Sequence, residues 1–138
     1  MSLTTPTAVT THLTAENAQY ASTFTSSALA LPPSKHYLLL TCMDARIDPG
    51  RAFGIGLGDA HVVRNAGASA RDALRSIVIS QQLLQTTEIV LVKHTDCGML
   101  TFTEAEGAAL VEERLGAEAV AEVRRGGQGD WVLGPFAK

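Results

Sequence analysis

The sequence predicts an α/β fold of three layers, in which a small, mostly parallel sheet is flanked by helices. Three short apolar runs are typical of buried parallel strands, and they cover residues 36–41, 60–63 and 88–93. Helical patterns separate these runs, and strands that alternate with helices form parallel sheets with right-handed crossovers. We therefore expect a sheet of three or four strands, and the length of 138 residues fits one domain.

The chain is expected to divide into an N-terminal arm, residues 1–34, and an α/β domain, residues 35–138. Residues 1–11 are rich in threonine and are predicted to be disordered or to form part of the arm. A helix is predicted over residues 14–31, because three large side chains have helical spacing: Tyr20, Phe24 and Leu29. A loose polar tail is the alternative for this segment. Two consecutive prolines then end the predicted helix.

Three helices are predicted within the domain, one after each strand. The first starts at Pro49, with Asp48 as its N-cap, but residues 51–57 are too rich in glycine for a long helix and are predicted to form a turn. The second covers residues 69–84, and its apolar face is predicted to consist of Ala73, Leu74, Ile77, Val78 and Leu84. The third covers residues 104–123 and is weakened by two glycines that could divide it: Gly107 and Gly116.

The composition excludes several classes of function. The formal net charge is −3 and no basic run is present, so binding to nucleic acid through phosphate neutralisation is not expected. No apolar stretch reaches the roughly 18 residues that a membrane span requires. The N-terminus has no basic start followed by an apolar core, so no secretory signal is seen and a cytoplasmic location is predicted.

Two thiols and one imidazole follow neighbouring strands of the predicted sheet. Cys42 comes directly after the first strand, and His94 and Cys97 follow the third. Ligands of open α/β sheets bind at the carboxyl ends of the strands, so these side chains are expected to converge. They form a Cys₂His set for Zn²⁺ with a fourth position open, which is typical of a catalytic site. A Cys42–Cys97 disulfide is the alternative, but it leaves His94 unexplained and a cytosolic chain keeps its thiols reduced.

An acidic and a basic residue follow Cys42 at alternate positions. Asp44 is a candidate for the fourth ligand, or it leaves that position to water. Arg46 is placed to hold the carboxylate of Asp44 through a charge-assisted pair. The alternative for this pair is a surface salt bridge, worth about 0–1 kcal/mol.

Four further polar residues near the strand ends have open roles. His61 begins the second strand and is predicted to be a satisfied core histidine. Arg64 and Asn65 either orient the ligand loops through hydrogen bonds or have a structural role only. Asp96, between two candidate ligands, is predicted to accept a hydrogen bond from a neighbouring amide and not to act as a base.

Three motifs in this order resemble the β-class carbonic anhydrases. They read Cys42-Met43-Asp44-Ala45-Arg46, His61-Val62-Val63-Arg64-Asn65-Ala66-Gly67 and His94-Thr95-Asp96-Cys97-Gly98. The resemblance covers roughly residues 35 to 115. Small carbonyl sulfide hydrolases, which share this fold and zinc site, are also similar.

The resemblance implies a zinc-dependent carbonic anhydrase that hydrates carbon dioxide to bicarbonate by zinc-bound hydroxide. It implies Cys42, His94 and Cys97 as metal ligands, with Asp44 and Arg46 as catalytic residues that open the metal to water. It also implies a homodimer in which the N-terminal arm packs on the partner. A carbonyl sulfide hydrolase and a zinc-binding relative without turnover are the two alternatives. Members of the family usually continue into a further helix and strand beyond about the point where this chain stops.

Overall fold

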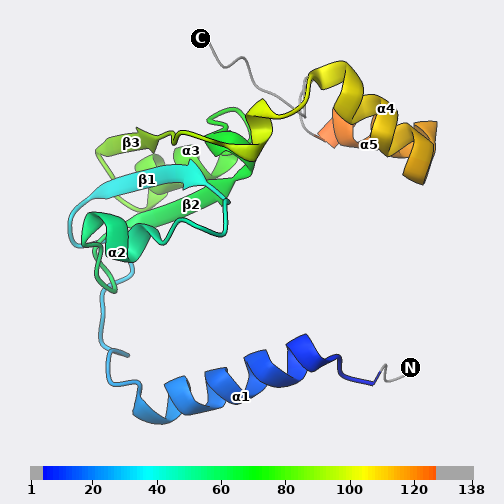
Figure 1. The fold of residues 1–138 in the computed structure, drawn as a ribbon. Coiled ribbons are helices and arrows are strands. Elements are labelled where there is room, and N and C mark those ends of the chain that lie inside the picture. Colours follow the sequence, from blue (N-terminus) through cyan, green and yellow to red (C-terminus); the bar gives the residue numbers. More distant parts are fainter. Residues whose placement is uncertain (1–4, 127–138) are drawn as a thin grey trace.

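The computed structural model of the protein describes residues 5–126 (Figure 1). The helices and strands follow in the order α1 (Ala8–Thr23), β1 (Tyr37–Cys42), α2 (Pro49–Phe53), β2 (His61–Asn65), α3 (Leu74–Leu83), β3 (Glu88–Val92), α4 (Glu104–Leu115) and α5 (Ala117–Gly126). There are also two short 3₁₀ turns. The first, η1 (Ala66–Ala68), follows β2, and the second, η2 (Gly98–Leu100), follows the loop after β3. The structure therefore confirms the predicted α/β architecture.

The three strands form one parallel sheet in the order β2-β1-β3. The central strand β1 begins one residue later than predicted, because His36 has a φ of 53° that does not fit an extended strand. At its other end β1 includes Cys42, which pairs with Asn65 of β2. The strand β2 is correspondingly longer than predicted, since Arg64 and Asn65 continue the ladder. Cys42 thus lies on the sheet and not in the loop beyond it.

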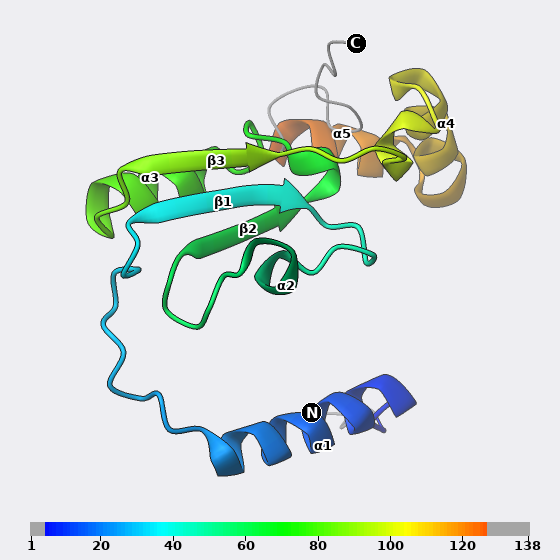
Figure 2. The ribbon, with the colours of Figure 1, turned by 60° about the vertical axis from the view of Figure 1, so that its left-hand side comes forward.

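The core lies between β1 and α3. Leu38 and Leu40 lie on one face of β1. They are buried against Ala73, the N-cap of α3, and against Ile77, which lies within α3. Figures 1 and 2 show α3 behind the sheet and the short α2 on its other side near β2. Leu91 of β3 is in register with Leu40 and remains 48% exposed, so α3 covers the central strand and leaves part of the edge strand open.

The predicted helix over residues 69–84 is wrong at its start and in part of its apolar face. Ser69 Oγ accepts a hydrogen bond from the backbone N–H of Asp72 at 3.3 Å, as a helix N-cap would. Residues 70–73 nevertheless form a turn, and the regular helix begins only at Leu74. Leu74 and Val78 are 48% and 49% exposed, because the helix rests on the sheet through a narrower stripe than predicted.

The predicted helix over residues 104–123 is two helices. Gly116 has a φ of 86° and separates α4 from α5, whereas Gly107 lies inside α4 without breaking it. The start of α4 is a capping box: Thr103 Oγ1 accepts from the backbone N–H of Glu106, and the Glu106 carboxylate accepts from the backbone N–H of Thr103 at 2.7 Å. The two helices pack against each other.

The first helix lies earlier in the sequence than predicted. It begins at Ala8, because Thr7 is its N-cap and accepts from the backbone N–H of Thr10 at 3.2 Å, so the prediction of disorder through residue 11 is wrong for this part. It ends at Thr23, where Phe24 is already extended. None of its residues is buried, and Figures 1 and 2 show it standing apart from the sheet. Within residues 5–126, no helix combines the length and the apolar character that a membrane crossing would need.

Candidate metal centre

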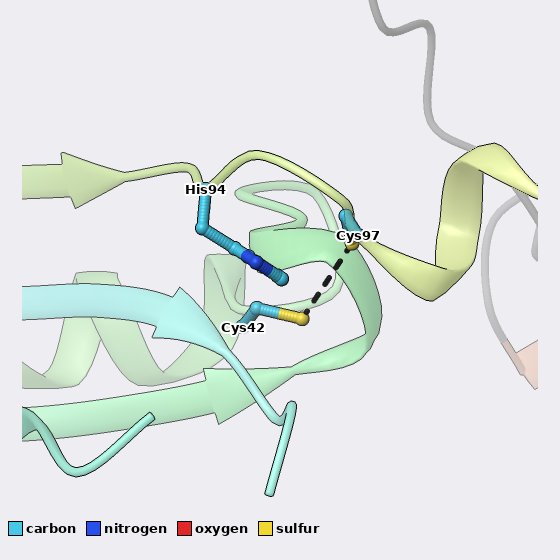
Figure 3. Close-up of side chains that lie close together, drawn as sticks. All are labelled: Cys42, His94 and Cys97. Carbon is cyan, nitrogen blue, oxygen red and sulfur yellow. Dashed lines mark hydrogen bonds between the residues drawn. The ribbon is translucent and has the colours of Figure 1, made fainter. Parts of the chain in front are cut away.

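The topology brings the two predicted ligand loops together. Cys42 ends β1, and the loop from His94 to Cys97 follows β3, which is the parallel neighbour of β1. Parallel neighbours end at the same edge of a sheet, so the two loops meet there. Figure 3 shows the three side chains pointing toward one another at this edge.

The ligand atoms of Cys42, His94 and Cys97 all lie within 4.8 Å of one another. The two sulfur atoms are 3.8 Å apart and both cysteines are buried and free, so the alternative of a disulfide is wrong. On a tetrahedral zinc with bonds of about 2.3 Å, two thiolates lie about 3.8 Å apart. The spacing of the two thiols therefore fits a metal ion of this kind.

The ring of His94 is oriented by its own loop. Its Nδ1 lies 2.9 Å from the carbonyl oxygen of Thr95, so Nδ1–H donates to that carbonyl and Nε2 keeps its lone pair. Nε2 is buried, and it has no hydrogen-bond partner within the described part of the chain. A buried polar atom without a partner is costly, and a metal ion would satisfy it. The donor set thus fits a metal through its geometry and through this unpaired nitrogen.

The two thiols have different acidities. Burial raises the pKa of Cys42, but the backbone N–H groups of Asp44 and Gly67, the ring of His94 and the neighbouring Cys97 together lower it to about 7. Burial, supplemented by the neighbouring Cys42, raises the pKa of Cys97. Thiols bind metals as thiolates, so metal binding here would release protons.

Asp44 is held by Arg46 through both of its carboxylate oxygens. Arg46 Nε donates to Oδ1 at 3.0 Å and Nη2 donates to Oδ2 at 2.7 Å, while the backbone N–H of Arg46 also donates to Oδ1 at 2.9 Å. These hydrogen bonds hold the pKa of Asp44 far below its usual range. Asp44 is therefore ionised and turned toward Arg46, and it is not part of the three-residue cluster.

Arg46 also contacts the second ligand loop, which sequence reasoning missed. Its Nη1 donates to Asp96 Oδ2 at 2.8 Å, and its Nη2 donates to the carbonyl oxygen of Asp96 at 2.7 Å. Asp96 is predicted to accept a hydrogen bond from a neighbouring amide. In the structure its carboxylate instead accepts a hydrogen bond from the guanidinium of Arg46. The signal in the sequence that could have predicted this contact is the opposite charge of Arg46 and Asp96, which lie in two loops expected to converge.

Arg64 supports the first ligand loop from β2. Its Nε donates to the carbonyl oxygen of Cys42 at 3.0 Å, and its Nη2 donates to the carbonyl oxygen of Asp44 at 2.7 Å. Of the two roles open for Arg64, the structure thus favours orientation of the loop. Both contacts fix backbone atoms at and beside a candidate ligand.

Asn65 and His61 contact other parts of the fold. The side chain of Asn65 donates to the carbonyl oxygen of Ser69 at 2.8 Å and accepts from its backbone N–H at 2.6 Å, which shapes the turn after β2. His61 Nδ1 lies 2.7 Å from Ser80 Oγ. His61 is therefore a partly buried, satisfied histidine, as predicted, and it is not part of the cluster of Cys42, His94 and Cys97.

The structure thus has a small parallel sheet, and a Cys₂His cluster lies at the carboxyl ends of its strands. The sequence profile described as carbonic anhydrase matches residues 37–126, from the start of β1 to the end of α5. The chain belongs to the carbonic anhydrase family.

Individual relatives place it near the β-class members of that family. Beta-carbonic anhydrase 1 of Mycobacterium tuberculosis is 50% identical over 109 residues, which are 78% of this chain and 66% of that protein. A carbonic anhydrase structure from Glaciozyma antarctica has a TM-score of 0.71 at 44% identity and covers 88% of this chain and 68% of its own. Carbon disulfide hydrolase of an Acidianus species is 44% identical over 79 residues, which are 56% of this chain and 39% of that protein. This chain thus spans just under two thirds of the length of the mycobacterial relative.

Proposed function

We propose that this protein is a zinc-dependent carbonic anhydrase that interconverts carbon dioxide and bicarbonate. The observation that carries the proposal is the convergence of two buried thiols and an unpaired imidazole nitrogen beside the Asp44–Arg46 pair. The similarity to β-class carbonic anhydrases supports the same reaction. We infer that Cys42, His94 and Cys97 hold the zinc ion.

Zinc bound by these residues would lower the pKa of a coordinated water to about 7 and so supply a nucleophile at neutral pH. Three protein ligands leave a fourth position for that water. The thiol of Cys42, whose pKa is already about 7, gives up its proton readily to become a ligand. The hydrogen bond from His94 Nδ1–H to Thr95 keeps the ligating nitrogen turned toward the two sulfur atoms.

Asp44 and Arg46 are proposed to control access to the fourth position. Arg46 engages both oxygens of Asp44 and so keeps this carboxylate from taking the fourth position itself. Because Arg46 keeps it ionised, Asp44 can accept a hydrogen bond from the attacking water and orient it. An ionised carboxylate of this kind acts as an acceptor and not as a proton donor.

A second candidate function is hydrolysis of a sulfur analogue of carbon dioxide. The similarity to carbon disulfide hydrolases favours it, and carbonyl sulfide belongs to the same group of small linear molecules. The same ligands and the same acceptor would serve this reaction. The lining of the substrate pocket decides between the substrates.

The test is metal content measured together with stopped-flow carbon dioxide hydration and with release of hydrogen sulfide from carbon disulfide and from carbonyl sulfide. We expect about one zinc per chain and hydration well above the buffer rate. Sulfide release faster than hydration would replace the main proposal with the second. Bound zinc with neither activity would indicate a metal-binding relative without turnover.

We further propose that the protein is a homodimer in which the arm, residues 1–34, packs on a second copy. Large apolar side chains of α1 are exposed in the single chain, among them Val9 at 65%, Leu13 at 59% and Tyr20 at 55%. An isolated helix of 16 residues is marginal in water and usually needs packing to be stable. A second chain would supply that packing.

A further inference from the structure

An apolar pocket of about 420 Å³ lies between the η2 turn and α4. Its walls include Ala66, Met99, Phe102, Glu106, Leu110 and Val111. It adjoins both ligand loops, because Met99 follows Cys97 by two residues and Ala66 follows Asn65, the register partner of Cys42. The pocket is of the size that binds a large side chain or a small ligand.

The path of the chain leads back toward this pocket. After the break at Gly116, α5 packs against α4 and runs back in the direction of the sheet, as both Figure 1 and Figure 2 show. Gly126 ends α5 and is the last described residue. The residues of α4 that line the pocket extend from Glu106 to Val111, and the start of α4 is the end of this helix that lies nearer to the sheet.

Residues 127–138 lie outside the described part, and their sequence contains four large apolar residues: Trp131, Val132, Leu133 and Phe136. The five residues from Gly126 to Trp131 can span at most about 17 Å. Trp131 is the only tryptophan of the protein. We propose that Trp131 docks in the pocket between η2 and α4 of its own chain.

The pocket has a polar group that suits an indole. A buried tryptophan usually donates its ring N–H to an acceptor. Glu106 is the acidic side chain of the pocket, and its Oε2 accepts from the backbone N–H and the hydroxyl of Thr103 at 2.7 and 2.9 Å. A carboxylate has about four acceptor sites, so capacity remains for one further donor.

Docking has a consequence for the metal loop. An indole in the pocket covers Met99 in the η2 turn, whose backbone is tied to Cys97 by the hydrogen bond from Leu100 N–H to the Cys97 carbonyl at 2.9 Å. Water is then excluded from the apolar wall next to the second ligand loop. The docking does not depend on which reaction the protein catalyses.

The experiment is fluorescence of the single tryptophan in the full-length protein. In the unaltered chain we expect a blue-shifted emission and protection from acrylamide quenching relative to N-acetyltryptophanamide. Leu110→Gln places a polar group in the pocket wall, and it should raise the quenching constant about twofold or more and shift the emission to the red. The matched control is Leu115→Gln, on the same helix but outside the pocket and 72% exposed, which should leave both quantities unchanged.

Far-UV circular dichroism verifies that both variants keep their helices. Emission and quenching like those of the free amide in the unaltered chain would overturn the proposal. So would equal effects of the two substitutions. Protection that disappears on dilution would also overturn it, because it would assign the pocket to the tryptophan of a second copy.

Discussion

Arg46 links the two ligand loops through Asp96. Nη1 of Arg46 donates to Asp96 Oδ2 at 2.8 Å and Nη2 donates to the Asp96 carbonyl at 2.7 Å, while the same guanidinium holds both oxygens of Asp44. Asp96 has a φ of 54°, an uncommon conformation for a residue other than glycine. The guanidinium is therefore anchored to the loop of His94 and Cys97 while it holds the carboxylate from the loop of Cys42.

We expect Asp96→Asn to lower carbon dioxide hydration about tenfold without loss of zinc, in line with the effects of other residues that support metal sites. The charged anchor of Arg46 is removed, whereas the contact with the backbone carbonyl and the pairing with Asp44 remain. Asparagine tolerates the positive φ at this position. The measurement is stopped-flow hydration beside metal analysis. Asp72→Asn, an exposed acid on the turn before α3, is the matched control, and equal rates in both variants would contradict the role of Asp96.

Removal of a ligand should remove the metal. We expect Cys42→Ser and His94→Ala each to lose most of the zinc found in the unaltered protein, since two ligands hold zinc far less well than three. Metal analysis after dialysis is the measurement. His12→Ala, which replaces an exposed histidine of α1, should keep its zinc. Full zinc content in both ligand variants would show that the cluster is not the metal site.

The Asp44–Arg46 pair should affect turnover more than metal binding. We expect Asp44→Asn to keep zinc and to lose hydration activity by about 10²-fold or more. Arg46→Ala should also lower activity, because Asp44 is then free to move toward the metal. Stopped-flow hydration on metal-analysed samples measures both. An Asp44→Asn variant with unaltered turnover would mean that this carboxylate has no part in the reaction.

The exposed apolar side chains of α1 should be required for assembly. Deletion of residues 1–33 is expected to give monomer or aggregate and to abolish turnover even though all three metal ligands remain. Leu13→Glu tests the same point with one substitution, because Leu13 is exposed and its change leaves the single chain intact. Ser22→Glu, on the same helix, is the control. Sedimentation equilibrium gives the result, and a full-length monomer that is active would contradict the proposed dimer.

The ion pair between Lys35 and Asp59 should make stability depend on pH. Lys35 Nζ lies 2.8 Å from Asp59 Oδ2, and this partner, with the backbone N–H of Gly56, lowers the pKa of Asp59 in the folded protein. Because the folded pKa lies below the unfolded value near 3.8, the stabilisation is complete above that value and is lost as the pH falls through the folded pKa. Asp59→Asn should therefore lower the urea midpoint at neutral pH.

The difference between the two proteins should shrink as the pH falls below about 4, because Asp59 is protonated first in the unfolded chain and only at lower pH in the folded protein. Urea unfolding followed by circular dichroism at a series of pH values measures it. Asp72→Asn again serves as the control for loss of one exposed negative charge. A constant difference across the whole range would assign the effect of Asp59→Asn to packing and not to ionisation.

The local pattern of the sequence was sufficient to predict the three strands and the Cys₂His cluster. Each strand is a short apolar run, and these runs were sufficient to locate the strands. The prediction that all three are buried is wrong for β2 and β3, which have no buried residue, because α3 covers mainly the central strand. Cys42 ends the first of these runs and His94 follows the third. The rule that parallel strands end at one edge of the sheet is therefore sufficient to bring the two residues together. The start of the short helix at Pro49 was also predictable, because its N-cap Asp48 accepts locally from the backbone N–H of Arg51. The helix continues through Phe53, so the predicted turn over residues 51–57 is wrong at its beginning.

Contacts between residues that are distant in the sequence could not be predicted from the sequence and are known only from the tertiary structure. The bond from Arg46 to Asp96 joins residues fifty positions apart, and it depends on the register of β1 with β3 and on the positive φ of Asp96. Whether Leu74 and Val78 are buried depends on how α3 rests on the sheet, which helical periodicity does not specify. Sequence by itself determined which residues reach the edge of the sheet, because strand direction is local, whereas the tertiary structure decided which of them pair, because pairing depends on how separate segments are packed.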